Sequence, residues 1–215
     1  MNKYLINAVV MLFLPQMCLA TVGGAESLEV LGFDQKDQKI FLARHYADAS
    51  GRLPTLYYYH LASSQPHKLI EVKSLYKQID RLPYTQVEKH FNREFKKIQS
   101  RLLPLQPLNT NRAKIQVIQR HFDIGHYWHT SHPDDEFDVK RYKQTYIVNN
   151  AAYKSATAQS ISFIDPKLEL RSLYALPQNN KKRSAQIAII RYQGIPVEMG
   201  YSKEDALLLL DEKKR

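Results

Sequence analysis

The sequence predicts an α+β fold in which an antiparallel β-sheet of about eight to ten strands predominates and one long amphipathic helix packs on it. Apolar and polar residues alternate with a period of two over most of the chain, whereas only residues 84–103 repeat apolar residues at a clear helical spacing. Strands and helices do not alternate along the chain, which disfavours a parallel doubly wound sheet.

Residues 27–72 are predicted to form a meander of antiparallel strands. Period-two patterns occupy 28–34, 39–46 and 55–61, and turn-forming residues join them at 35–38 and 48–54. The triplet Leu31–Phe33 and the aromatic strand Leu56–Tyr59 resemble one blade of a TolB-type propeller. A propeller needs several such repeats, and the sequence shows no second copy.

Residues 84–103 form the predicted helix. Its apolar residues recur at spacings of three and four and are Val87, Phe91, Phe95, Ile98 and Leu102. Thr85 and Glu88 fit a capping box, and Pro104 ends the pattern. The opposite face carries the basic residues Lys89, Arg93, Lys96, Lys97 and Arg101. These cations favour either a solvated helix face or a surface for a polyanion.

β patterns return after the helix and continue through most of the remaining chain. The predicted strands are 114–122, 138–150, 159–165, 168–176, 184–192 and 195–201, the last two joined by a tight turn at 193–194. The short element 203–211 is ambiguous, because Ser202 and Asp205 fit a helix cap while Leu207–Leu210 fit a buried strand.

Residues 1–20 have the pattern of a secretory signal peptide. Lys3 precedes an apolar run from Tyr4 to Leu14, and the small residues Cys18 and Ala20 suit cleavage after Ala20, with Ala25 as a second candidate site. The run is too short to span a membrane, so we expect export to the periplasm or the extracellular space and one mature domain, 21–215. Cleavage would remove the only cysteine and lower the net charge from +10 to +9.

The basic charge and the absence of familiar catalytic motifs predict a binding protein. The sequence contains no Gly-x-Ser-x-Gly elbow, phosphate-binding loop or dinucleotide-binding glycine fingerprint. A basic surface favours a polyanionic envelope component or a partner protein, and nucleic acid is not expected after export. The candidate binding residues are Lys89, Arg93 and Lys96 on the helix, Lys181, Lys182 and Arg183 in a hairpin tip, and Tyr57 and Tyr59.

Residues 125–138 concentrate histidines and carboxylates and form a candidate metal site. The candidate ligands are His126, His129, His132 and Asp134. Imidazole and carboxylate groups suit zinc where no cysteine is available, so zinc is the one cofactor that these residues suggest. This segment supports an alternative function as a metal-dependent hydrolase.

Part of that segment, His132–Glu136, reads HPDDE and resembles the string found in zinc-dependent N-acetylglucosaminyl deacetylases. The resemblance implies that His132 and Asp135 bind zinc and that Asp134 is the general base. Phe137–Lys140 stands where that family has a glycine-rich turn, and the sequence contains no histidine after His132. The surrounding pattern therefore departs from that of the family.

Overall fold

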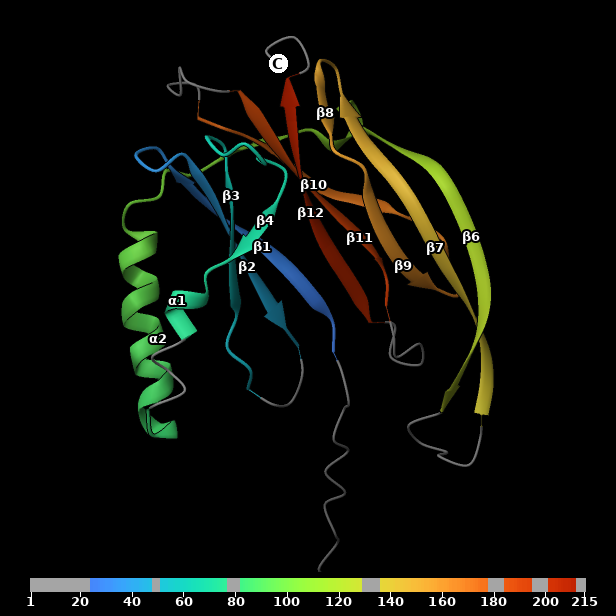
Figure 1. Ribbon diagram of the computed structural model, residues 1–215, viewed down its shortest axis with the longest axis horizontal. Helices are drawn as coiled ribbons and strands as arrows, with labels where there is room; N and C mark the ends of the chain where they lie inside the picture. The colour runs from blue at the N-terminus through green and yellow to red at the C-terminus, as the bar shows by residue number, and fades with distance from the viewer. Residues whose placement is uncertain are drawn as a thin grey trace, which may run out of the picture.

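The computed structural model (Figure 1) describes residues 24–47, 51–76, 82–128, 136–177, 184–194 and 201–211. These residues form a four-stranded and an eight-stranded sheet, and every strand pair in both sheets is antiparallel. The predominance of antiparallel β-structure is thus confirmed. The described residues contain twelve strands, more than the sequence predicts.

The smaller sheet is a meander with the order β1-β2-β3-β4. Its strands are β1 (Glu26–Asp34), β2 (Lys39–Tyr46), β3 (Thr55–His60) and β4 (Leu69–Glu71). Residues Ile40–Ala43 of β2 are buried on both faces of the sheet. One face packs on the larger sheet and the other on the helical segment, because the meander is the middle layer of the molecule.

The helical segment is shorter than the sequence predicts. It comprises α1 (Lys73–Tyr76) and the sixteen-residue α2 (Tyr84–Gln99), so the expected long amphipathic helix through residue 103 is wrong. Leu103 instead exchanges backbone hydrogen bonds of 2.8 and 2.9 Å with Phe33, which draws the chain out of the helix. The expected capping box does not form, because Pro83 is the N-cap and no side chain caps the helix.

The larger sheet has the order β5-β10-β11-β12-β8-β7-β6, with β9 also paired to β7. Its strands are β5 (Gln106–Leu108), β6 (Lys114–Trp128), β7 (Glu136–Asn150), β8 (Tyr153–Ser155), β9 (Ala158–Phe163), β10 (Glu169–Ala175), β11 (Ala185–Gln193) and β12 (Ser202–Asp211). The short 3-10 helix η2 (Thr110–Arg112) leads into β6. In Figure 1, α2 and the pair β6 and β7 lie at opposite flanks of the molecule.

The ambiguous segment 203–211 is a strand, and the helix-cap alternative is wrong. It forms most of β12, which pairs with β11 along Ser202–Leu210 and, on its other edge, with β8 along Leu209–Asp211. Leu208 and Leu210 pack toward the smaller sheet, while Leu207 and Leu209 pack on the opposite face. Burial on both faces requires a continuous apolar run, which hides the period of two. Most of the predicted strand 195–201 lies outside the described residues.

The hydrophobic core lies in two layers on either side of β10, β11 and β12 and in a third between the smaller sheet and the two helices. The first layer fills the space between the sheets and includes Phe33, Leu42 and Ile187. The second lies between these central strands and β7, where Tyr146 and Val148 are fully buried. This second layer positions the hairpin formed by β6 and β7. No described helix is both long and apolar enough to cross a bilayer.

Candidate functional site

The histidine-rich segment lies at the end of the β6–β7 hairpin. Its first four residues belong to β6 and its last three to β7. The Nδ1 atom of His126 lies 2.7 Å from the Oδ1 atom of Asp138, and both side chains are exposed. The other candidate ligands, His129, His132 and Asp134, lie outside the described residues, as does Asp135. The described residues alone contain no cluster of three or more metal-ligating side chains.

The predicted tyrosines occupy different environments on β3. Tyr59 is buried at 2% exposure and donates a hydrogen bond of 2.6 Å to the carbonyl oxygen of Ala206. Its expected role at a binding surface is therefore wrong, because the ring packs between the two sheets. Tyr57 is half-buried on the same strand, and burial is the largest cause that raises the pKa of its hydroxyl group.

The predicted basic residues of the helix line a shallow depression along α2. Lys89, Arg93 and Lys96 are all exposed there and lie beside Glu88 and Asn92. The Nε atom of Arg93 lies 3.0 Å from Glu94, so part of this charge is neutralised within the helix. Lys181, Lys182 and Arg183 lie outside the described residues. The depression thus brings together only the helical part of the predicted basic surface.

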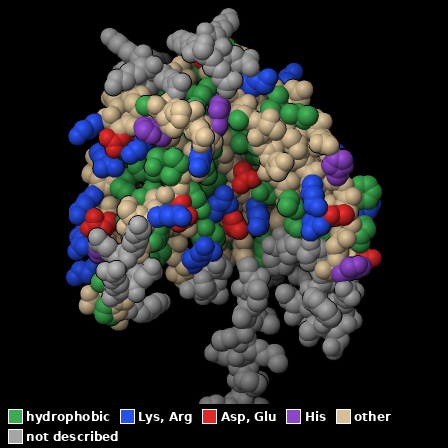
Figure 2. Space-filling model, in the orientation of Figure 1, with side chains coloured by type: hydrophobic (Ala, Val, Ile, Leu, Met, Phe, Trp, Pro, Cys, Tyr) green, Lys and Arg blue, Asp and Glu red, His purple; other side chains and the backbone are tan. Residues whose placement is uncertain are grey.

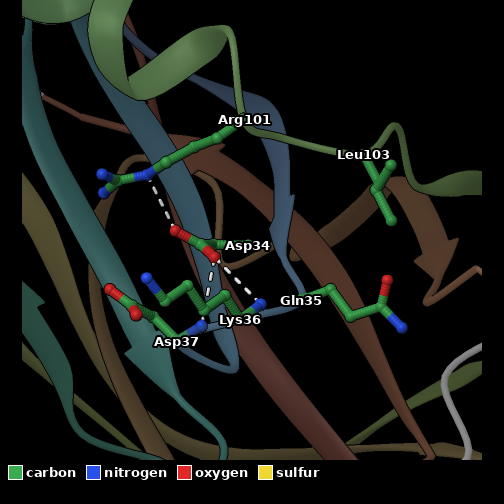
Figure 3. A pocket seen from close by; sticks show the side chains of 6 residues that line it. All are labelled: Asp34, Gln35, Lys36, Asp37, Arg101 and Leu103. Atoms are coloured by element: carbon green, nitrogen blue, oxygen red, sulfur yellow. Dashed lines mark hydrogen bonds and ion pairs between the residues drawn. The ribbon is translucent and has the colours of Figure 1, made fainter.

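A second depression surrounds the turn between β1 and β2 (Figure 3). Asp34 is 3% exposed, and its Oδ1 atom accepts hydrogen bonds of 3.1 Å from the backbone N–H groups of Lys36 and Asp37. Its Oδ2 atom lies 2.8 Å from Nε of Arg101, a residue of the predicted basic stripe. Both carboxylate oxygens are engaged, so Asp34 holds the turn against the chain that follows α2.

A buried carboxylate connects the two sheets. Glu204 on β12 is 1% exposed and lies 2.8 Å from Nε of Arg171 and 2.9 Å from a terminal nitrogen of Arg191. The other carboxylate oxygen accepts a hydrogen bond of 2.8 Å from the backbone N–H of Leu28, while Arg171 donates one of 2.6 Å to the Leu28 carbonyl. Glu204 and Arg171 thus form hydrogen bonds with the backbone N–H and C=O groups of Leu28, on the edge of β1 that does not pair with β2. The arrangement is a structural clamp, because its charges are paired with one another.

A third feature is the set of exposed large apolar side chains on β6, on β9 and just after β9, which we call the apolar corner. All the large hydrophobic residues that are exposed in the described part of the chain belong to it. They are Val117, Ile118, Phe122, Ile124, Ile161 and Ile164. Phe122 is the most exposed of them at 64%. Figure 2 shows hydrophobic and basic side chains interleaved along the right-hand margin, over β6 and β7.

The register explains why part of the apolar corner is exposed. Residues directly opposite on neighbouring strands share a face, and Phe122 is opposite Tyr142 while Val117 is opposite Tyr146. Tyr146 is covered by the second core layer, but Phe122 is not. The ring of Phe122 instead contacts Tyr142, with ring centroids 6.1 Å apart, and Lys140, with Nζ 5.9 Å from the ring centroid. The inner face of the hairpin is therefore apolar and basic.

The outer face of the sheet at this hairpin is basic and mainly polar, and Ile161, opposite Lys143, lies on it. Asp123 receives two hydrogen bonds of 2.6 and 2.7 Å from Arg141 and lies 3.1 Å from Nζ of Lys143. Hydrogen bonds and charge from these two cations hold the pKa of Asp123 far below its usual range. One carboxylate is shared by two cations, so this face keeps an excess of positive charge.

The apolar corner was not predicted from the sequence. The alternating pattern identifies 114–122 as a strand, and it places apolar residues on one side of that strand. Whether such a face is covered depends on which strands pair with it and where the core ends, and periodicity carries no information on either. The signal in the sequence was that apolar residues at Phe122 and Ile124, with Asp123 between them, continue the alternating pattern past the predicted end of the strand.

Comparison of the chain with protein-family models, with curated proteins and with solved structures finds no match.

Proposed function

We propose that the protein is exported and acts by binding an envelope component or a partner protein, rather than by catalysis, and that the apolar corner is its contact surface. The observation that supports this proposal is the exposure of Val117, Phe122 and Ile124 on one face of the β6–β7 hairpin, at one flank of the molecule. Exposed apolar groups that are clustered, rather than scattered singly, mark interaction surfaces. The opposite flank is formed by α2 and its polar depression.

The charges around the apolar corner favour an acidic partner. Lys114, Lys140 and Lys143 are exposed on β6 and β7, and Arg120 is exposed on β6 between the apolar side chains. The whole chain carries a net charge of +10, so long-range attraction would also steer acidic partners toward the protein.

The contact surface is tested by site-specific photo-cross-linking in cells that produce the protein. A photoreactive amino acid replaces Phe122 in one variant and Asn92, an exposed residue of α2, in the other. We expect a discrete adduct from position 122 and none from position 92. Adducts from position 92 alone, or equal adducts from both, would assign the contact elsewhere and contradict the proposal.

Export is tested separately by determining the N-terminus of the protein in fractionated cells. Cleavage after Ala20 predicts a mature protein that begins at Thr21 and leaves the cytoplasm. Full-length protein retained in the cytoplasm would contradict export.

A metal-dependent hydrolase is the second candidate. The observation that favours it is the 2.7 Å pair of His126 and Asp138 at the base of the histidine-rich hairpin end, because a metal-binding histidine commonly has a carboxylate beside its second nitrogen. Metal analysis of the purified mature protein decides between the two functions. The binding proposal predicts no stoichiometric zinc.

Variants sharpen that metal analysis. Bound zinc that disappears in the His129→Ala and His132→Ala variants would replace the binding proposal with the hydrolase. His45→Ala is the matched control, because the Nε2 atom of His45 lies 2.9 Å from the carboxylate of Glu29 on the surface of the smaller sheet. Loss of zinc in that control as well would assign the metal to nonspecific binding.

A further inference from the structure

Within the described part of the chain, the edge of the larger sheet at β6 is open. β6 has fifteen residues and, among the described strands, pairs only with β7. Alternate residues of such a strand turn their N–H and C=O groups away from the sheet, where another strand can bind them. From Gln119 to Trp128 the pairing with β7 continues without a register shift, and this stretch contains no proline.

The strands other than β6 at the ends of the two sheet orders are short or shielded, whereas the six-residue β9 also pairs with one described strand alone, β7. β5, at the opposite end of the larger sheet, has three residues and contains Pro107. β4 also has three residues, and the clamp of Glu204 and Arg171 binds the backbone of β1 at Leu28. Proteins commonly limit unwanted strand pairing by short edges, proline and covering groups. β6 differs from these other ends, although a register shift between Val117 and Gln119 interrupts its first part.

The side chains of β6 define the pattern of a strand that would pair with it. Phe122 and Ile124 project from one face, and His121 and Asp123 project from the other. A paired segment must therefore alternate as well, placing apolar side chains beside Phe122 and Ile124. Such a segment would bind the open backbone groups and cover the exposed apolar side chains at the same time.

The charges decide between an acidic partner and a second copy of this chain. A second copy would bring its own net positive charge to an edge where Arg120, Lys140 and Lys143 are already exposed, and like charges across an interface are unfavourable. An acidic segment would instead be attracted to these cations. Charge complementarity thus selects the partner.

We propose that β6 binds an extended segment of a partner protein, alternating in acidic and apolar residues, as an additional strand of the larger sheet. This inference rests on the proposed binding function and specifies its ligand. The main-chain hydrogen bonds supply affinity, and the alternation of side chains supplies specificity.

The probe for this inference is a nonapeptide of alternating Glu and Val with blocked termini. A peptide of alternating Glu and Pro has the same charge but lacks every second N–H group, and each proline fixes φ at about −65°, away from the values of a β-strand. We expect the Glu–Val peptide to bind and to slow hydrogen exchange of β6 amides. The Glu–Pro peptide is expected to bind at least about tenfold more weakly, a difference of about 1.4 kcal/mol. Equal binding of the two peptides, or binding without protection of β6, would overturn strand addition.

Two variants add the same charge at different places in the apolar corner. Phe122→Glu places a carboxylate on β6, whereas Ile161→Glu places one on β9, which pairs with the other side of β7. Both side chains are exposed, so neither change removes a core contact. We expect Phe122→Glu to weaken peptide binding about tenfold and Ile161→Glu to change it by less than about twofold. Equal weakening by both variants would indicate general repulsion and overturn pairing at β6.

Sedimentation of the protein without peptide tests the second copy as the occupant. We expect a monomer. A dimer that Phe122→Glu dissociates would show that β6 pairs with itself and would overturn the acidic partner.

Cross-linking from position 122 without protection of β6 amides would leave the binding proposal standing and overturn strand addition. Protection of β6 by the peptide with no cross-link in cells would overturn the binding proposal instead.

Discussion

At the scale of single residues, Glu204 connects the two sheets most directly. Glu204→Ala would leave Arg171 and Arg191 without their shared carboxylate and the N–H of Leu28 without its acceptor. We expect a loss of about 3 kcal/mol in the free energy of unfolding, at the lower end for a buried ion pair because both arginines reach solvent. Urea denaturation measures this loss.

Lys203→Ala is the control for Glu204→Ala. Nζ of Lys203 lies 3.4 Å from Glu26, and the side chain is half-exposed, so removing it is expected to change stability by less than about 1 kcal/mol. Equal losses for the two variants would show that the clamp contributes no more than a surface ion pair.

Gly32 allows the chain after α2 to cross β1 closely. Its φ angle is +147°, and a Cβ atom placed there would lie 2.8 Å from both the Leu103 carbonyl oxygen and the Leu102 Cβ atom. Gly32→Ala is therefore expected to lower the free energy of unfolding by about 2 kcal/mol or more, measured in urea.

Gly51 provides the comparison for Gly32. Its φ angle is +64°, but an added Cβ atom would meet nothing within 4 Å, so Gly51→Ala carries the conformational penalty without the clash. Similar losses at the two positions would show that the approach of Leu103 does not constrain β1.

At the scale of elements, Phe91 attaches α2 to the smaller sheet. It is 2% exposed, and its ring centroid lies 5.5 Å from that of Phe95 and 6.1 Å from that of Tyr76. Phe91→Ala is expected to lower the free energy of unfolding by about 3–5 kcal/mol, because a cavity replaces the ring. Phe122→Ala makes the same chemical change on the exposed face of β6 and is expected to cost less than about 0.5 kcal/mol. Chemical denaturation of both variants compares them, and equal losses would contradict the assigned burial.

Elements with one covered face were predictable, and elements whose limits depend on distant contacts were not. The pattern over 138–150 predicts β7 nearly to its limits, since one face packs on the second core layer. The end of α2 could not be predicted, because the backbone pairing of Leu103 with Phe33 joins distant parts of the chain. β12 remained ambiguous from sequence because both of its faces are buried.

The same distinction applies to the candidate site. Residue chemistry identified His126 and Asp138 as belonging to one segment, and strand pairing brings them to 2.7 Å. Residue type alone could not separate Tyr59, which is buried, from a surface aromatic. Nor could it find the open edge of β6, because an edge is a property of the order of strands in the sheet.

At the scale of the whole molecule, three buried tyrosines predict alkaline sensitivity. Burial, followed by the charge of Asp205, raises the pKa of Tyr59, Tyr146 and Tyr192 well above the ordinary value. The folded protein then binds more protons than the unfolded chain above about pH 10, so stability is full below that pH and decreases as pH rises.

Each of these tyrosines is expected to contribute a decrease of about 1.4 kcal/mol per pH unit once it ionises in the unfolded chain. Urea midpoints measured between about pH 9 and 12 test this slope. Tyr192→Phe removes one ionising group and the hydrogen bond of 2.8 Å to Asp205, so it is expected to lower stability at neutral pH but flatten the alkaline slope. An unchanged slope in that variant would contradict the expected effect of Tyr192.

The position of β12 also determines when the larger sheet can assemble. β12 follows every other described strand in the sequence, yet it lies between β11 and β8 in the sheet. Leu209 pairs with Ser155, more than fifty positions earlier in the chain, and such distant pairings slow folding. Until Ser202–Asp211 has been synthesised, β11 lacks its neighbour and both core layers remain open on one side. The larger sheet therefore cannot be completed before its last described strand has been made.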